Sequence, residues 1–347
     1  MKQRDGVNSG QTVLITGAGG SIGSALAQSI VSSRPRLVIL LDHSEQNLYE
    51  VHTELTANGG PALNVPILGD IADEPLLNEV LEKYRPDAIY HLAAFKHVPL
   101  METNPIAVVR NNALGTWALA HAALQHRVQR LIMISTDKAV NPRSVMGAAK
   151  RIAELVLLRF SNPGTRMSAI RLGNVWGSHG SVVPLFQQQI ARGGPLRVTH
   201  RESRRYFLSL DDTVDLILAA TLSEDAGIFV PELGEPVKIL DLANNLIREA
   251  GARAEGIEII FTGLRPGDKL SEELIAAREW IESTSDSRIR RVCCTEMSPT
   301  LLDSALQTIS EGVRSRNLPA LVEVLCNVVP DYQPSEMLLG LLNPSPV

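Results

Sequence analysis

The feature that most constrains the fold of this chain is a glycine-rich turn between a short apolar run and a helical segment. Residues Thr12–Thr16 have the composition of a buried strand, and Ser21–Ser33 have helical periodicity. Between them the sequence fits the pattern G-x-x-G-x-x-G. Glycines at this spacing allow a tight turn and let a pyrophosphate approach the backbone N–H groups at the start of the helix. The residues predicted to form this dinucleotide site are Gly17, Gly20, Ser21, Ile22 and Gly23.

Short apolar runs alternate with helical segments as far as about Leu172. The further strands expected are Leu37–Leu41, Asn64–Leu68, Ala88–His91, Leu131–Ile134 and Ser168–Leu172. The helices expected among them are Glu45–Ala57, Glu74–Tyr84, Ala107–His126 and Val145–Phe160. Repeated βα units imply a parallel sheet with helices on both faces. Residues 1–173 are therefore predicted to be a Rossmann-type, doubly wound α/β domain that binds the dinucleotide.

Beyond about Gly173 the strict alternation fades, although helical stretches continue. The helices expected there are Val183–Arg192, Leu210–Leu222, Ile239–Ala250 and Pro299–Ser315. We expect residues 174–347 to be a smaller, mixed α/β C-terminal part that binds the substrate. This part is predicted to pack intimately on the first and not to be independent of it.

Composition and charge argue against several classes of partner. The chain has 347 residues, 44% of them hydrophobic, and so can bury a substantial core. A net charge of −5 without a Lys/Arg-rich run argues against nucleic-acid binding. Every apolar run is far shorter than the roughly 20 residues that span a bilayer, and the N-terminus is polar, so we expect a cytoplasmic protein without membrane contact. Cysteines and histidines lack metal-ligand spacing, so no metal is expected.

The choice of cofactor depends on Asp42, which ends the second predicted strand. An acid at this position can bind a ribose 2′-hydroxyl and would repel the additional phosphate of NADP, so NAD is predicted. Residues after the third and fourth strands fall at the same carboxyl edge of the sheet, where the cofactor crevice is expected. The further cofactor contacts predicted there are Asp70, Ile71, Ala93 and Ala94.

Polar residues that could move protons follow the fifth predicted strand. Thr136, Asp137 and Lys138 end it, while Met146 and Lys150 lie four residues apart on the next helix and share a face. A thioether has no proton to exchange at any pH, so Met146 cannot be an acid or a base. Asp137 and Lys138 are the candidates, and both reach one substrate only if the strand has ended by Asp137.

The chain resembles the extended short-chain dehydrogenases/reductases, with Met146 in place of the tyrosine in their Tyr-x-x-x-Lys pattern. More narrowly, it is similar to the nucleotide-sugar 4,6-dehydratases of the bacterial polysaccharide-biosynthesis family, in which methionine at this position is a recurring variant. The stretches that carry the resemblance are TGAGGSIGS, LDHSEQNLYEV, HLAAFKHVPLMETNP, STDKAVNPRSVMGAAKRIAE, RLGNVWGSHGSVVPLF, GEPVKILDLA and FTGLRPGDKLSEEL. They extend from Thr16 to Leu274, over most of the chain.

The resemblance implies that UDP-N-acetylglucosamine is converted to a 4-keto-6-deoxy sugar nucleotide, with NAD unchanged at the end of the cycle. It implies Lys138 as the base at C5 and Asp137 as the acid at C6. Asp137 could also accept the C4 proton, directly or through water, with Thr136 positioning the hydroxyl. A lysine base requires a lowered pKa, which burial or the cations Lys96 and Lys150 could supply.

The resemblance also implies binding roles. Lys150 is expected to orient the nicotinamide ribose, and Met146 to fill the volume of the tyrosine, whether it touches the cofactor or only packs. Lys96 is expected near both sugar and cofactor. The residues nominated for the nucleotide-sugar substrate are Lys96, Asn174, Arg205 and Arg265.

Two other functions stay open at the level of sequence. A UDP-N-acetylhexosamine 4-epimerase needs the oxidation at C4 but neither a base at C5 nor an acid at C6, so the Asp137-Lys138 pair argues against it. A non-catalytic NAD-binding regulator would have lost its chemistry with the tyrosine. By analogy, the helices at 107–126 and 145–160 pair between subunits, so a homo-oligomer is expected. Many relatives carry a membrane-bound N-terminal region, and its absence here predicts a free-standing cytosolic form.

Overall fold

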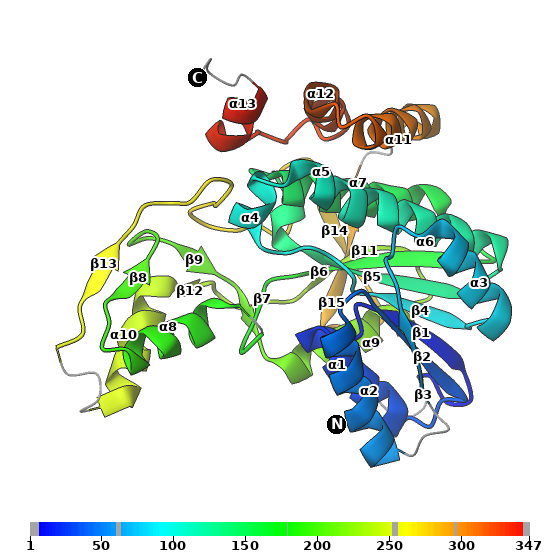
Figure 1. Cartoon of the computed structure of the whole chain (residues 1–347), viewed down its shortest axis with the longest axis horizontal. Helices are drawn as coiled ribbons and strands as arrows, with labels where there is room; N and C mark the ends of the chain where they lie inside the picture. Colours follow the sequence, from blue (N-terminus) through cyan, green and yellow to red (C-terminus); the bar gives the residue numbers. More distant parts are fainter. Residues whose placement is uncertain (1–6, 60–63, 179, 252–255, 295–296, 343–347) are drawn as a thin grey trace.

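The computed structural model describes residues 7–59, 64–178, 180–251, 256–294 and 297–342 (Figure 1). Its centre is a nine-stranded sheet in the order β14-β15-β11-β6-β5-β4-β1-β2-β3. Six of these strands come from the first part of the chain: β1 Thr12–Thr16, β2 Leu37–Asp42, β3 Asn64–Leu68, β4 Ala88–His91, β5 Arg130–Thr136 and β6 Arg166–Leu172. All six are parallel, as the repeated βα units predict. The predicted fold class is confirmed.

Helices cover both faces of the sheet because side chains alternate along each strand. Val13 and Ile15 of β1 pack with one set of helices, and Leu14 packs with the other. The first set is α1 Ser21–Ser32, α2 Glu45–Gly59 and α9 Leu210–Leu222. The second set is α3 Glu74–Tyr84, α6 Gly115–Gln125 and α7 Val145–Phe160, on the opposite face in Figure 1. The strands are consequently buried on both sides.

The predicted helix Ala107–His126 forms, but a π-helical turn interrupts its regular hydrogen bonding. After the short helix α4 Val98–Glu102, helical backbone continues without a break through α5 Pro105–Val108, the π-helical turn Val109–Leu114 and α6. The Asn112 amide accepts from the backbone N–H of Phe95 and donates to the carbonyl of Phe95, at 2.9 Å each. This tertiary contact fixes the π turn against the loop after β4, and helical periodicity alone does not reveal it.

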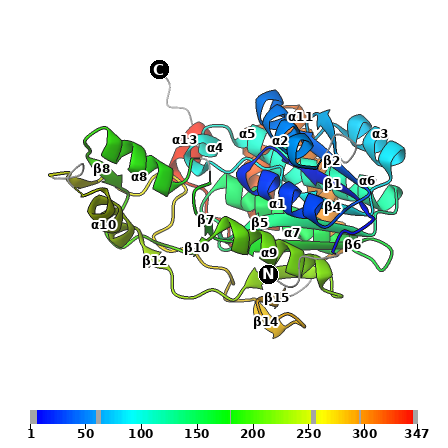
Figure 2. The same cartoon turned by 90° about the horizontal axis from the view of Figure 1, so that it is seen from below.

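The second part of the chain completes the sheet of the first. Strand β11 Gly227–Pro231 pairs with β6 in parallel, and β15 Ile289–Cys293 and β14 Trp280–Ser283 follow in antiparallel order. The remainder forms a lobe with its own small core, beside the carboxyl edge of the sheet (Figures 1 and 2). The lobe contains α8 Val182–Ala191, β8 Leu196–Val198, β9 Arg204–Arg205, β12 Val237–Lys238, α10 Ile239–Ala250 and β13 Ile259–Phe261. Strands β7 Asn174–Val175 and β10 Phe207–Leu208 connect the lobe to the sheet.

Three C-terminal helices lie over the helices of the first part (Figure 1). These are α11 Pro299–Arg314, α12 Leu318–Val328 and α13 Glu336–Leu342. Helix α11 packs on α7 and the π turn, and α12 packs on α5 and α7. These contacts occupy part of the helical surface that the family analogy assigns to subunit pairing, so the predicted oligomer stays a prediction. Across the described residues, we find no helix that combines the length and apolarity needed to cross a bilayer.

Candidate active site

The predicted cofactor residues meet at the carboxyl edge of the sheet, where β1 lies between β2 and β4. From β1 the chain runs to β2 and β3 on one side and then crosses to β4 on the other side of β1, and this switch point opens a crevice beyond the strand ends. The glycine turn follows β1, Asp42 ends β2, and Ala93 and Ala94 follow β4. The structure therefore gathers side chains and backbone from separate βα units at one edge.

Two glycines of the turn have no room for a side chain. Gly17 has a φ of 68°, and a Cβ added to it would lie 2.6 Å from the backbone nitrogen of Ala93. A Cβ on Gly23 would lie 2.2 Å from the carbonyl oxygen of Gly17. Gly20 is the N-cap of α1 and has no side chain that could cap the helix. Because Ser21 and Ile22 open the helix there, its first N–H groups suit a pyrophosphate.

A Gly17→Ala substitution is expected to lower the free energy of unfolding by about 1–3 kcal/mol and to weaken NAD binding. Both the left-handed φ and the contact with Ala93 oppose a Cβ at this position. Gly10→Ala is the matched control, because Gly10 has a φ of 70° and open space around its Cβ position. Denaturant unfolding and equilibrium NAD binding measure the two effects. Equal losses of NAD binding in both variants would contradict the proposed packing role.

Asp42 holds the glycine turn by accepting hydrogen bonds from backbone N–H groups. Its Oδ2 accepts from the backbone N–H of Gly19 at 2.9 Å, and its Oδ1 accepts from that of Ser44 at 2.9 Å. The side chain is buried, yet each carboxylate oxygen keeps a second lone pair that could accept from a ribose hydroxyl. The predicted cofactor residue is thus also an anchor of the turn.

Asp70 and Ile71 follow β3 on the outer side of this crevice. Arg110 donates to Asp70 at 2.7 Å, and the backbone N–H of Ala72 donates to it at 2.9 Å. Partial burial alone would raise the pKa of the Asp70 carboxyl, but these two donors bring that pKa below its usual value. Ile71 is buried against the α6 residue Gly115. The carboxylate is therefore held ionised at the rim of the crevice.

Strand β5 ends at Thr136, and Asp137–Ala139 form one turn of 3₁₀ helix. The geometric condition set by the sequence is thereby met, since Asp137 and Lys138 are no longer on opposite faces of a strand. Lys138 Nζ donates to Asp137 Oδ1 at 2.8 Å, and the Thr136 hydroxyl donates to the same oxygen at 3.0 Å. Asp137 is fully buried, and its Oδ2 has no hydrogen-bond partner among the described residues. One oxygen of this buried carboxylate thus lacks a protein partner in the described part of the chain.

The expectation of a lowered pKa for Lys138 is wrong. Burial alone would lower the pKa of this amine, but the carboxylates of Asp137 and Glu272 raise it above its usual value. Glu272 Oε1 lies 3.6 Å from Lys138 Nζ, in a segment far away in the sequence. Sequence analysis missed Glu272. The repeated acids of the SEEL stretch were visible, but only the tertiary fold brings one of them to the end of β5.

Of the residues predicted to bind the diphosphate, Arg205 is already engaged. Its guanidinium donates to the carbonyls of Lys269 at 2.8 Å and Leu270 at 3.2 Å, and it lies 3.7 Å from Glu272. In this position Arg205 holds the segment that carries Glu272, and the structure gives no separate indication of a diphosphate contact. The sequence could not show this because the carbonyls come from a distant loop.

The other predicted substrate residues come from three separate segments of the chain. Arg265 is 57% exposed at its side chain and donates to Asp268 at 2.8 Å, so the guanidinium faces solvent and is oriented. Asn174 is in β7, where its backbone N–H donates to the carbonyl of Tyr206 at 2.8 Å. Lys96 is exposed in the loop between β4 and α4. Their binding roles stay predictions.

Met146 and Lys150 occupy the buried face of α7. Met146 belongs to the main apolar core, which agrees with the expectation that it fills volume. Burial lowers the pKa of the Lys150 amine to about 8, although Glu154 opposes the change. Nearby His91 bonds to the hydroxyls of Thr16 and Thr116, and burial lowers its pKa to about 3. His91 therefore stays neutral and is a structural residue that the sequence did not single out.

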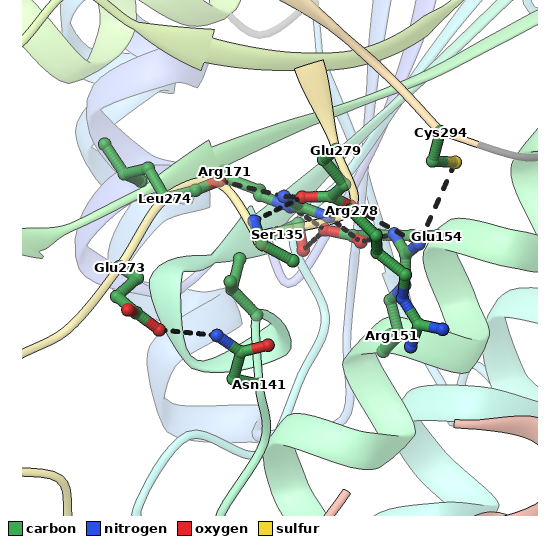
Figure 3. A network of polar contacts seen from close by, with 12 residues as sticks. Ser135, Asn141, Arg151, Glu154, Arg171, Glu273, Leu274, Arg278, Glu279 and Cys294 are labelled. Carbon is green, nitrogen blue, oxygen red and sulfur yellow. Dashed lines mark hydrogen bonds and ion pairs between the residues drawn. The ribbon is translucent and has the colours of Figure 1, made fainter. Parts of the chain in front are cut away.

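A buried ionic network lies behind the proton-handling turn (Figure 3). Arg171 of β6 is fully buried between two carboxylates and donates to Glu154 at 2.9 Å and to Glu279 at 2.7 Å. Ser135, next to Thr136, donates to Glu154 at 2.6 Å. Arg171, Arg151 and the Ser135 hydroxyl outweigh burial and lower the pKa of Glu154 to about 2. The network joins β5, β6, α7 and the segment that follows Glu272.

Comparison with known protein families assigns the chain to one of them. Residues 13–293 match the family model described as polysaccharide biosynthesis protein. The chain belongs to this family. The matched region contains every predicted site residue and ends before the C-terminal helices. The family match thus includes both the Rossmann-type sheet and the residues predicted to form the site.

Relatives of this chain are named for different activities. The capsular polysaccharide biosynthesis protein CapD of Staphylococcus aureus is 48% identical over 273 residues, which are 78% of this chain and 46% of CapD. The chain thus spans about half the length of that relative. UDP-N-acetylglucosamine 4,6-dehydratase (inverting) of Campylobacter jejuni is 32% identical, over 77% of this chain and 78% of the enzyme. UDP-glucose 4-epimerase of Rickettsia conorii is 33% identical, over 78% and 79%.

Solved structures have the same fold. The structure of Pen from Bacillus thuringiensis superposes with a TM-score of 0.76 at 25% sequence identity. The superposition covers 87% of this chain and 98% of Pen. The likeness therefore extends beyond the nucleotide-binding sheet into the second part of the chain.

Proposed function

We propose that the chain is an NAD-dependent 4,6-dehydratase of a nucleotide sugar, with UDP-N-acetylglucosamine as substrate, in the synthesis of bacterial surface polysaccharide. The observation that carries this proposal is the pair of buried Asp137 and partly exposed Lys138, joined at 2.8 Å at the end of β5. Dehydration needs both an acid and a base close together, whereas epimerisation at C4 needs neither at C5 or C6. Relatives named as UDP-N-acetylglucosamine 4,6-dehydratases support the same assignment.

The residues at the edge of the sheet fit NAD. The glycine turn and the start of α1 would hold the pyrophosphate, Asp42 would accept from a ribose hydroxyl, and Lys150 would orient the nicotinamide ribose. When bound there, NAD would supply the acceptor for the hydride from C4 and the source of the hydride for C6. The Asp42 carboxylate is buried beside the turn, and it would repel the additional phosphate of NADP.

Asp137 and Lys138, which share one turn of 3₁₀ helix, then exchange protons with the sugar. Asp137, as carboxylate, accepts the C4 hydroxyl proton, with Thr136 positioning the hydroxyl. The next step starts from the neutral form of the Lys138 amine, which is the minor form because Asp137 and Glu272 raise its pKa. This neutral amine removes the C5 proton, and Asp137 returns its proton to the C6 hydroxyl, which leaves as water. Lys138 finally gives its proton back to C5. Both residues end as they began, and the sugar has lost one water.

The direct test is the mass of the product. Incubation with UDP-N-acetylglucosamine and NAD is expected to give a product lighter by one water, measured by mass spectrometry. An unchanged mass with a new hexosamine epimer would instead support a 4-epimerase, the second candidate, which the Rickettsia relatives favour. NAD binding without turnover of either kind would support a non-catalytic regulator. Proton coupling constants of the keto sugar then report on which face C5 is reprotonated.

A further inference from the structure

Lys138 lies between two carboxylates that come from different parts of the chain. Its Nζ is 2.8 Å from Asp137 Oδ1 and 3.6 Å from Glu272 Oε1. Glu272 is 4% exposed, and its Oε2 has no hydrogen-bond partner in the part of the chain that the structure describes. A buried carboxylate is costly unless cations compensate it. The buried charge of Glu272 therefore has to be compensated by the groups around it.

Three cations compensate this carboxylate. Lys138 is at 3.6 Å, Arg205 at 3.7 Å, and Lys269 at 3.6 Å. Arg205 and Lys269 are also bonded to backbone carbonyls, Lys269 to that of Val140 at 2.5 Å. Lys138 differs from the other two because its remaining polar contact is the other carboxylate, Asp137.

Both the lobe and the sheet hold the backbone that carries Glu272. Arg204 of β9 donates its N–H to the carbonyl of Leu270 at 3.0 Å and forms a β-bridge with Ser271. On the other side, Lys269 donates to the carbonyl of Val140, and Arg171 of β6 donates to that of Leu274 at 2.8 Å. An anion from a segment remote in sequence is thus held beside the amine at the end of β5.

We propose that Glu272 is a positioning residue for Lys138, which holds the amine beside Asp137 and stabilises its protonated form. The inference rests on the proposed function, in which Lys138 is the base. Asp137 and Glu272 face the amine as anions, and Arg205 and Lys269 approach it as cations from β9 and the neighbouring segment. Glu272 stabilises the ammonium form, so its removal makes the neutral base available at lower pH.

The test compares Glu272→Gln with Glu273→Gln. The two variants remove the same charge from adjacent residues, but Glu273 is exposed and accepts from the Asn141 amide at 2.6 Å. Loss of an opposite charge at this distance is expected to lower the pKa of Lys138 by about one unit or more. The acidic limb of the rate of water loss against pH should move to lower pH by that amount in Glu272→Gln. Glu273→Gln should retain the wild-type limb.

A second measurement does not depend on turnover. The side-chain NMR signal of Lys138, assigned by its absence in Lys138→Ala, reports the titration of the amine in the whole protein. It should titrate lower in Glu272→Gln, and lower by a smaller amount in Glu272→Asp, which keeps the charge but shortens the side chain. An unchanged Lys138 titration in both Glu272 variants would overturn the inference even if the enzyme dehydrates the sugar. A shifted titration without dehydration would retain the charge coupling and reject the proposed function.

Discussion

Replacing Lys138 by alanine is expected to slow the loss of water from UDP-N-acetylglucosamine by about 10²–10⁴-fold, the usual contribution of a positioned acid or base. Asp137→Asn should have an effect of similar size, because an amide of the same shape can neither accept the C4 proton nor donate one to the C6 hydroxyl. Asp137 is fully buried and its unbonded Oδ2 is the available acceptor, so water has little access to replace it. Product formation followed by mass spectrometry measures both rates.

Controls separate chemistry from binding. Both variants should bind NAD as the wild type does, because the glycine turn and Asp42 are at a different strand end. Lys238→Ala provides a matched lysine control, since Lys238 pairs with Glu202 at 2.9 Å on the lobe. Wild-type turnover in Lys138→Ala or Asp137→Asn would remove the proposed role of that residue. Loss of turnover in Lys238→Ala as well would point to a general disturbance of the lobe.

Replacing Arg171 by methionine is expected to lower the free energy of unfolding by about 3–5 kcal/mol, the usual effect of removing one partner from a buried ion pair. Methionine retains much of the arginine stem, so the main loss is the charge between Glu154 and Glu279 (Figure 3). Of the cations in the described residues, Arg151 alone then compensates the two buried carboxylates, at 2.8 Å and 3.4 Å. Denaturant unfolding measures the change.

The matched control is Arg159→Met, which breaks the surface pair with Asp303 at 3.0 Å and should cost only about 0–1 kcal/mol. The Arg171→Met deficit should also be similar at pH 5.5 and pH 8. The pKa of Glu154 is lowered from 4.5 to about 2, so its stabilisation is present above pH 4.5 and is lost only as the pH falls toward 2. Equal effects of the two substitutions would contradict the structural role of the network.

Local patterns were sufficient to predict the sheet and the position of the site. Each of the first six strands forms within two residues of its expected bounds, because a strand buried on both faces needs a continuous apolar run. The glycine turn was also predictable from the spacing of its glycines. The structure gives the reason for that spacing, since Gly17 and Gly23 have no space for a Cβ. The acid and base candidates follow β5 directly, so their side of the sheet was predictable from strand direction alone.

The ionisation of those candidates was not predictable, because it depends on groups that are remote in sequence. Asp137, the neighbour in sequence, and Glu272, from a remote segment, together reverse the expected direction of the Lys138 pKa shift, and only the tertiary fold brings Glu272 to the amine. Arg205 likewise donates to backbone carbonyls of this remote segment. The sequence by itself thus determined which strand ends carry the chemistry, because periodicity and turns are local. Only the tertiary structure decided the charge around them, because Coulomb interactions depend on distance through space.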